Sequence, residues 1–225
     1  MSAFPYRFRV GGGVALAALV AAGCHSPGLY TSARPVDTGS IMAGVALEPV
    51  VFLSSKEFST IGPSATALLR VGTSKHTDLG IRFNAMTFGW DFKIAPYLSE
   101  RWAFAVIPGG RAGQGYWFHA PAVVSYDATS WLRLVATGGV SLSHKAYASA
   151  GPETMIAISP IPVSGGGRPD GWHGRLGLGL DLHSERGFGV FPEVTYLQST
   201  EPYAYSSLFL ALGITFGRVG FRLGE

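Results

Sequence analysis

Apolar residues alternate with small or polar residues along nearly the whole chain, and this period constrains the fold more than any other feature. In residues 172–183, for example, every second residue from Leu176 to Leu182 is leucine, and glycine or aspartate lies between them. A period of two places successive side chains on opposite faces of a β-strand. No long helical period is present, although residues 144–160 leave room for a short helix. The chain is therefore predicted to be all-β.

The alternation divides the chain into ten candidate strands. Their ranges are 39–53, 64–72, 78–87, 89–98, 101–108, 116–126, 131–142, 172–183, 188–197 and 206–216. Pro108 and Pro121 limit hydrogen-bond pairing where they fall, because proline has no backbone N–H. No linker divides the strands, so a single domain over residues 39–225 is expected.

The two faces of these strands differ in an unusual way. One face is almost uniformly Leu, Ile, Val, Phe and Trp, whereas the other combines small residues with charged ones. A soluble barrel would carry many Lys, Glu, Gln and Ser on its water-facing side, whereas a transmembrane barrel turns its apolar face to lipid and its polar face inward. The predicted interior charges are Glu48, Arg70, Arg82, Asp91, Lys93, Arg133, Arg175, Asp181 and Glu193. Because five basic and four acidic residues nearly balance, we expect a plugged, charge-paired interior rather than a wide pore.

The connections between strands alternate in length. Those after even-numbered strands are short, and those after odd-numbered strands are mostly long, except for the tight connection around Phe88. Short periplasmic turns and long outer loops are typical of bacterial outer-membrane barrels. Over residues 39–225 the chain resembles a small outer-membrane β-barrel protein, and Phe216 resembles the aromatic end of their last strand. The resemblance implies one antiparallel up-and-down transmembrane barrel of about ten strands, with eight to twelve left open.

The N-terminus resembles a bacterial lipoprotein signal. Arg7 and Arg9 precede an apolar stretch, residues 11–20, that is too short to span a bilayer, so residues 1–23 are predicted to be a signal peptide. Residues 19–24, Leu-Val-Ala-Ala-Gly-Cys, resemble a lipobox, although Ala21 stands where Leu is preferred. The resemblance implies lipidation of Cys24, a lipidated tether over residues 24–38, and a periplasmic N-terminus. An ordinary secretory signal with a chance cysteine is the alternative.

Few residues of this sequence point to chemistry. Removal of residues 1–23 leaves 15 of the 17 basic residues against 14 acidic ones, which gives no electrostatic case for nucleic acid. The glycine-rich stretch 109–115 leads into a strand instead of a helix, so it is predicted to be an outer loop and not a phosphate site. The six histidines have no metal-ligand spacing, and no cofactor is expected. The Ser–His neighbours 143–144 and 183–184 point to opposite strand faces, so we expect no enzyme.

These observations favour an outer-membrane β-barrel (lipo)protein with a structural or surface-interaction role, with a narrow solute channel as a variant. Its expected partners are outer-membrane lipid and the barrel-assembly and lipoprotein-sorting machinery. The long loop 143–171, with its apolar run 155–158, is the candidate contact site for a partner that the sequence does not identify. The alternative is a lipid-anchored periplasmic soluble β-barrel that binds a small apolar ligand inside.

Overall fold

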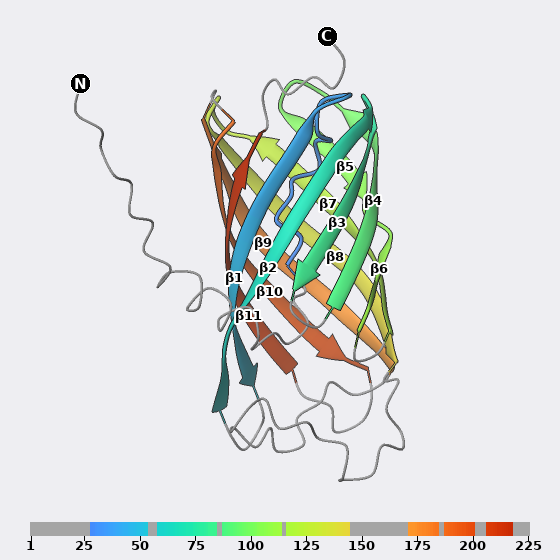
Figure 1. Cartoon of the computed structure of the whole chain (residues 1–225), viewed down its shortest axis with the longest axis vertical. Helices are drawn as coiled ribbons and strands as arrows, with labels where there is room; N and C mark the ends of the chain where they lie inside the picture. The colour runs from blue at the N-terminus through green and yellow to red at the C-terminus, as the bar shows by residue number, and fades with distance from the viewer. Residues whose placement is uncertain are drawn as a thin grey trace, which may run out of the picture.

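The protein forms a closed antiparallel β-barrel (Figure 1). The computed structural model describes residues 28–53, 58–84, 87–113, 116–144, 171–184, 187–200 and 206–217. Strands that are neighbours along the chain pair antiparallel, apart from the two short strands at 102–106 and 109–112, and the last strand pairs back with the first. The strands are β1 (Ile41–Leu53), β2 (Phe58–Ser74), β3 (Thr77–Asn84), β4 (Thr87–Leu98), β5 (Trp102–Val106), β6 (Gly109–Ala112), β7 (Tyr116–Asp127), β8 (Leu132–His144), β9 (Gly171–His183), β10 (Gly189–Ser199) and β11 (Ser206–Phe216). The described residues include no helix that is long and apolar enough to cross a membrane.

Strands β5 and β6 together act as one wall strand, so the barrel has ten strands around its circumference, as predicted. Both pair with β4 on one side and with β7 on the other. The break falls at Ile107 and Pro108, yet Ile107 N still donates to Pro121 O at 2.9 Å, and Pro108 O accepts from Phe92 N at 2.9 Å. The prediction of an outer loop at 109–115 is therefore wrong for residues 109–112, because the strand resumes there as β6. Proline and glycine interrupt this strand without ending it.

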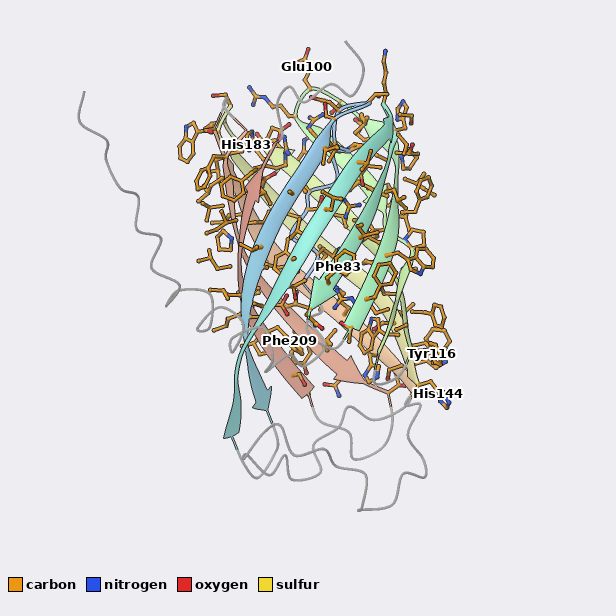
Figure 2. The ribbon with its side chains drawn as sticks, in the orientation of Figure 1. Phe83, Glu100, Tyr116, His144, His183 and Phe209 are labelled. Carbon is orange, nitrogen blue, oxygen red and sulfur yellow. The ribbon has the colours of Figure 1, made fainter. Side chains whose placement is uncertain are left out.

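The wall has an apolar outside and a polar inside, as the alternation predicts. Leu176 and Leu178 on β9 are 65% and 68% exposed, whereas their neighbour Arg175 is 5% exposed. The register keeps these faces aligned across the strands, since Arg133 pairs with Asp181 and Leu134 with Leu180. Side chains project outward along both sides of the barrel in Figure 2, and large exposed apolar residues of this kind occur on β1, on β3 to β5 and on β7 to β11.

The two ends of the barrel differ. At the end that we call the turn end, short connections follow β2, β4, β7 and β9, and Glu100 and His183 mark it in Figure 2. At the opposite end, the loop end, lie Tyr116 and His144. The loop end carries the connection between β8 and β9, which includes the apolar run 155–158. That run, the signal peptide, Cys24 and residues 218–225 lie outside the described residues.

Residues 28–38, which we call the inner segment, run inside the barrel (blue trace in Figure 1). Leu29 is 2% exposed, and Ser32 and Ala33 are fully buried. The part of the expected tether that the structure describes therefore lies inside the barrel. A ten-stranded barrel encloses more space than its own side chains fill, since eight strands already leave just enough room for them. The small and apolar residues of the inner segment occupy that space.

Candidate functional site in the barrel interior

The structure places all nine predicted interior charges inside the barrel, where each is buried. Eight of them form one cluster on β2, β3 and β4 and pairs on β8, β9 and β10, and the ninth, Glu48, lies on β1. Two further buried charges, Asp78 and Arg111, escaped the prediction. Asp78 begins a predicted strand and shares its face with Arg82, so the period itself could have identified it. Arg111 fell within the predicted loop.

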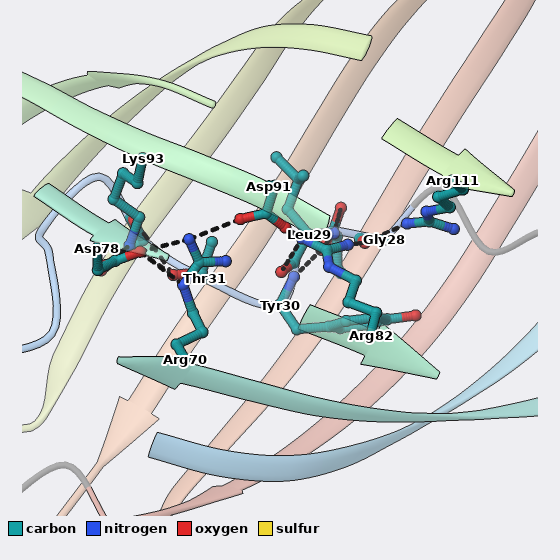
Figure 3. A network of polar contacts seen from close by, with 12 residues as sticks. Gly28, Leu29, Tyr30, Thr31, Arg70, Asp78, Arg82, Asp91, Lys93 and Arg111 are labelled. Atoms are coloured by element: carbon teal, nitrogen blue, oxygen red, sulfur yellow. Dashed lines mark hydrogen bonds and ion pairs between the residues drawn. The ribbon is translucent and has the colours of Figure 1, made fainter. Parts of the chain in front are cut away.

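The cluster on β2, β3 and β4 joins alternating charges through short contacts (Figure 3). Arg70 Nη2 lies 2.7 Å from Asp91 Oδ1, and Arg82 Nη2 lies 2.7 Å from Asp91 Oδ2. Asp78 binds Arg70 as well, with its Oδ1 2.9 Å from Arg70 Nε, and its Oδ2 lies 3.1 Å from Lys93 Nζ. Each carboxylate thus contacts two cations, which offsets the cost of removing these charges from water.

The remaining pairs lie across the barrel on β8, β9 and β10. Arg133 Nη1 lies 3.0 Å from Asp181 Oδ2, and Arg175 Nη2 lies 3.0 Å from Glu193 Oε1. Thr195 Oγ1 also donates to Glu193 Oε1, at 2.7 Å. Because the pairs join neighbouring strands, they fix the register of the wall as well as balancing charge.

The same wall residues bind the backbone of the inner segment. Glu193 Oε2 accepts from Leu29 N at 3.0 Å and from Tyr30 N at 3.1 Å. Lys93 Nζ donates to Arg34 O at 2.9 Å. Asp78 also accepts from Val36 N, and Arg82 donates to the carbonyls of Gly28 and Leu29. Two side-chain hydroxyls of the segment accept as well, Thr31 Oγ1 from Lys93 and Ser32 Oγ from Arg133. The interior is therefore a site built around an extended peptide, which here is part of the chain itself.

The inner segment is also fixed at the turn end. Arg34 Nη2 donates to Ser99 O at 2.7 Å and to Glu100 O at 2.8 Å, and its Nε lies 2.6 Å from Asp127 Oδ2. Thr38 forms a parallel bridge with Gly72, whose carbonyl accepts from Gly39 N at 2.8 Å. The contacts join the segment to three of the four turns at this end.

Replacing Gly72 by alanine is expected to displace the inner segment. A Cβ at this position would overlap the carbonyl oxygens of Val36 and Asp37, which are backbone atoms and cannot rotate away. We expect Gly72→Ala to lower the free energy of unfolding by about 1–3 kcal/mol. Gly138→Ala is the matched control, because its nearest neighbour atom there, Leu176 Cδ2, lies 3.6 Å away. Urea unfolding of both variants in detergent gives the comparison, and equal midpoints would contradict the expectation.

A serine and a histidine meet near the loop end. Ser143 Oγ lies 2.8 Å from His173 Nε2, and the ring of Trp117 stacks on His173 with centroids 5.4 Å apart. The sequence analysis missed this pair, because the two residues lie 30 positions apart on β8 and β9. All three side chains are buried. The contact gives both buried polar groups a hydrogen-bond partner inside the wall.

Comparison with known proteins identifies the fold. No family model matches the sequence, and no curated protein matches it. An outer membrane channel from Pseudomonas putida F1 matches in structure with a TM-score of 0.50 and 8% identity, over 86% of this chain and 100% of that chain. The attachment invasion locus protein Ail of Yersinia pestis matches with a TM-score of 0.38 and 10% identity, over 79% of this chain and 96% of that chain. The N-terminal β-barrel domain of Pseudomonas aeruginosa OprF matches with a TM-score of 0.37 and 10% identity, over 80% of this chain and 98% of that chain. The likeness to the Pseudomonas putida channel, together with the closed ten-stranded barrel, shows that the chain has the fold of bacterial outer-membrane β-barrels.

The interior does not fit the alternative of a soluble barrel that binds an apolar ligand. Such a barrel needs its leucines and phenylalanines inside, but Leu176, Leu178 and Phe118 all face outward, at 65%, 68% and 55% exposure. The inside holds charged residues and the inner segment. Within the described residues, no group of three or more His, Cys, Asp or Glu is arranged to hold a metal ion.

Proposed function

We propose that the protein is an outer-membrane barrel, lipidated on Cys24, that is closed by its own inner segment and acts through its loop end in a structural or surface-interaction role. The observation that carries this proposal is the binding of the inner segment by buried wall charges from both sides of the barrel. Glu193 on β10 binds its backbone at Leu29, and Asp78 on β3 binds it at Val36. A barrel filled in this way is suited to hold loops at a surface.

The solute-channel variant is less well supported by the same contacts. A channel needs charges that face water along an open path, as the polar lumen of a porin does. Here the cluster charges pair with one another, and Lys93 and Arg82 also bind backbone carbonyls of the inner segment. Conduction would require this segment to leave.

The outside of the barrel supports a transmembrane position. Exposed Trp102 and Trp131 lie near the turn end, and exposed Trp172 and Tyr116 lie near the loop end. Aromatic side chains of this kind are typical of the two interfaces of a membrane, with aliphatic residues such as Leu178 between them. We place the turn end in the periplasm and the loop end outside, because outer-membrane barrels have short periplasmic turns. Assembly would then use the barrel-assembly and lipoprotein-sorting machinery of the cell envelope.

Membrane extraction tests this proposal. We expect Cys24→Ala, exported by a standard secretory signal, to stay in the outer-membrane pellet after an alkaline wash, because the strands themselves span the bilayer. The wild-type protein and a soluble periplasmic protein serve as controls in the same fractions. Release of the variant into the supernatant would mean that the lipid is the only anchor.

A further inference from the structure

The wall holds the inner segment as a site holds a ligand, and not as an additional strand. Residues 28–37 belong to no strand, and Thr38 pairs with Gly72 only through the isolated bridge at the turn end. Deeper in the barrel, charged side chains of β3, β4 and β10 bind the backbone N–H and C=O groups of the segment. The segment can therefore leave without breaking the strand pairing of the wall.

Three consecutive side chains of the segment meet specific groups of the wall. Thr31 Oγ1 accepts from Lys93 Nζ at 2.7 Å, and Ser32 Oγ accepts from Arg133 Nη1 at 2.9 Å. Ala33 is fully buried in an apolar cluster, which leaves no room for a larger side chain. The wall thus selects two hydroxyl residues followed by a small one.

The next residue, Arg34, is recognised at the turn end. Its Nη2 donates to the carbonyl oxygens of Ser99 and Glu100, and its Nε lies 2.6 Å from Asp127 Oδ2. A carboxylate and two backbone carbonyls together match the fork of donors on a guanidinium, which the single ammonium of a lysine does not reproduce. The wall therefore selects arginine at this position.

The residue before the run, Tyr30, is an aromatic anchor. It is 1% exposed and packs in one cluster with Met42 and Leu68. Gly213 on β11 leaves space for the ring, because a Cβ there would lie 3.1 Å from Tyr30 Cδ1. The backbone of Tyr30 has a φ of 48°, which a residue other than glycine adopts only where its surroundings hold it. The wall thus fixes the place of an aromatic ring.

The wall is closed without the help of the segment. β1 and β11 pair with each other from Ala43 to Leu53. The ion pairs of Asp91 with Arg70 and of Glu193 with Arg175 join wall residues to one another, so they do not depend on the segment. The groups that bind the segment are therefore held in place in advance, which favours binding of a separate ligand.

We propose that the barrel interior is a sequence-selective binding site for an extended peptide, and that it binds residues 30–34, Tyr-Thr-Ser-Ala-Arg, also when they are no longer joined to the wall. The ligand class is a peptide with an aromatic residue, two hydroxyl residues, a small residue and an arginine in this order. It enters at the turn end, where the side chain of Arg34 is 24% exposed. This proposal rests on closure of the barrel by the inner segment and adds selectivity and exchange to it.

Cleavage of the full chain tests the proposal. A protease recognition sequence is inserted between Asp37 and Thr38, which are both exposed, in the Cys24→Ala background so that no acyl chain retains the cut fragment. The cut protein is unfolded and refolded in detergent with an excess of a fluorescent peptide of residues 28–37. We expect the label to elute with the barrel. The uncut protein, whose own segment competes within the same chain, should take up little label, and a peptide with residues 30–34 in reversed order should not bind.

Substitutions in the peptide measure its selectivity. We expect Arg34→Ala and Ser32→Leu each to weaken binding by about tenfold or more, because one loses a charge pair and the other overfills a buried position. Asp37→Asn is the matched control, because this side chain is exposed, and should change binding by less than about twofold. Asp127→Ala in the wall should weaken binding of the natural peptide but not of the Arg34→Ala peptide.

Three results would overturn the proposal. They are equal binding of the natural and reversed peptides, a refolded barrel that shows the gel shift on heating but takes up no label, and a cut protein that does not refold with the peptide although the uncut protein refolds. The alkaline wash described above reports the membrane position of the barrel independently. An outer-membrane barrel without a peptide site would therefore be recognised as such.

Discussion

Deletion of residues 28–36 is expected to convert the closed barrel into an ion-conducting one. A ten-stranded wall encloses more space than its side chains fill, and the inner segment occupies that space. Without it, Glu193 and Lys93 lose the backbone partners at Leu29 and Arg34 and face water instead. Purified protein in planar lipid bilayers gives the measurement. We expect discrete conductance steps for the deletion variant and none for the wild-type protein under the same voltage.

The control for this deletion removes residues 218–225, a similar length of chain at the other terminus, and is expected to leave the bilayer silent. Both variants must first show the gel shift on heating that folded barrels give, so that conductance is compared between folded proteins. Steps of equal size and frequency in the wild-type protein would mean that the inner segment does not close the barrel, and the solute-channel variant would then be the better proposal.

The sequence predicts the wall well because the wall depends on a local rule. Period two assigns each residue to a face, and this rule placed charges as far apart as Glu48 and Glu193 inside the barrel without any knowledge of their partners. The same rule applies to Asp78, which begins the predicted strand 78–87 and lies on the same face as Arg82. The break at Pro108 was misread because the local signal of proline and glycine is the same for a loop and for an interrupted strand.

The inner segment could not be predicted by such a rule. Its composition, with Pro27, Pro35 and several hydroxyl residues, is that of a linker. Its burial depends on contacts between distant parts of the chain, such as Leu29 N with Glu193, 164 positions away. These contacts use the backbone of the segment, which has no sequence signature. One indirect signal was present, because a ten-stranded barrel with a balanced interior leaves space that something must fill.

Neutralising Asp78 is expected to give the largest loss of stability among single substitutions in the wall. Asp78 is fully buried and binds Arg70, Lys93 Nζ at 3.1 Å and Val36 N at 2.9 Å. Asp78→Asn keeps the shape of the side chain but removes one carboxylate charge from beside Lys93 and Arg70, and Arg70 still contacts Asp91. We expect the free energy of unfolding to fall by about 3–5 kcal/mol, because an uncompensated charge then remains buried. Urea unfolding in lipid vesicles measures the change, with Lys75→Met at an exposed turn as the unaffected control.

A double-mutant cycle separates the charge pair from the general cost of altering the interior. Lys93→Met removes the cation and leaves Asp78 paired with Arg70, so we expect a smaller loss than for Asp78→Asn. In the double variant the uncompensated charge is gone. Its loss in free energy of unfolding should therefore be smaller than the sum of the two single losses by about 0.5–3 kcal/mol. Strict additivity would show that Asp78 stabilises the barrel through Arg70 and Val36 N instead of through Lys93.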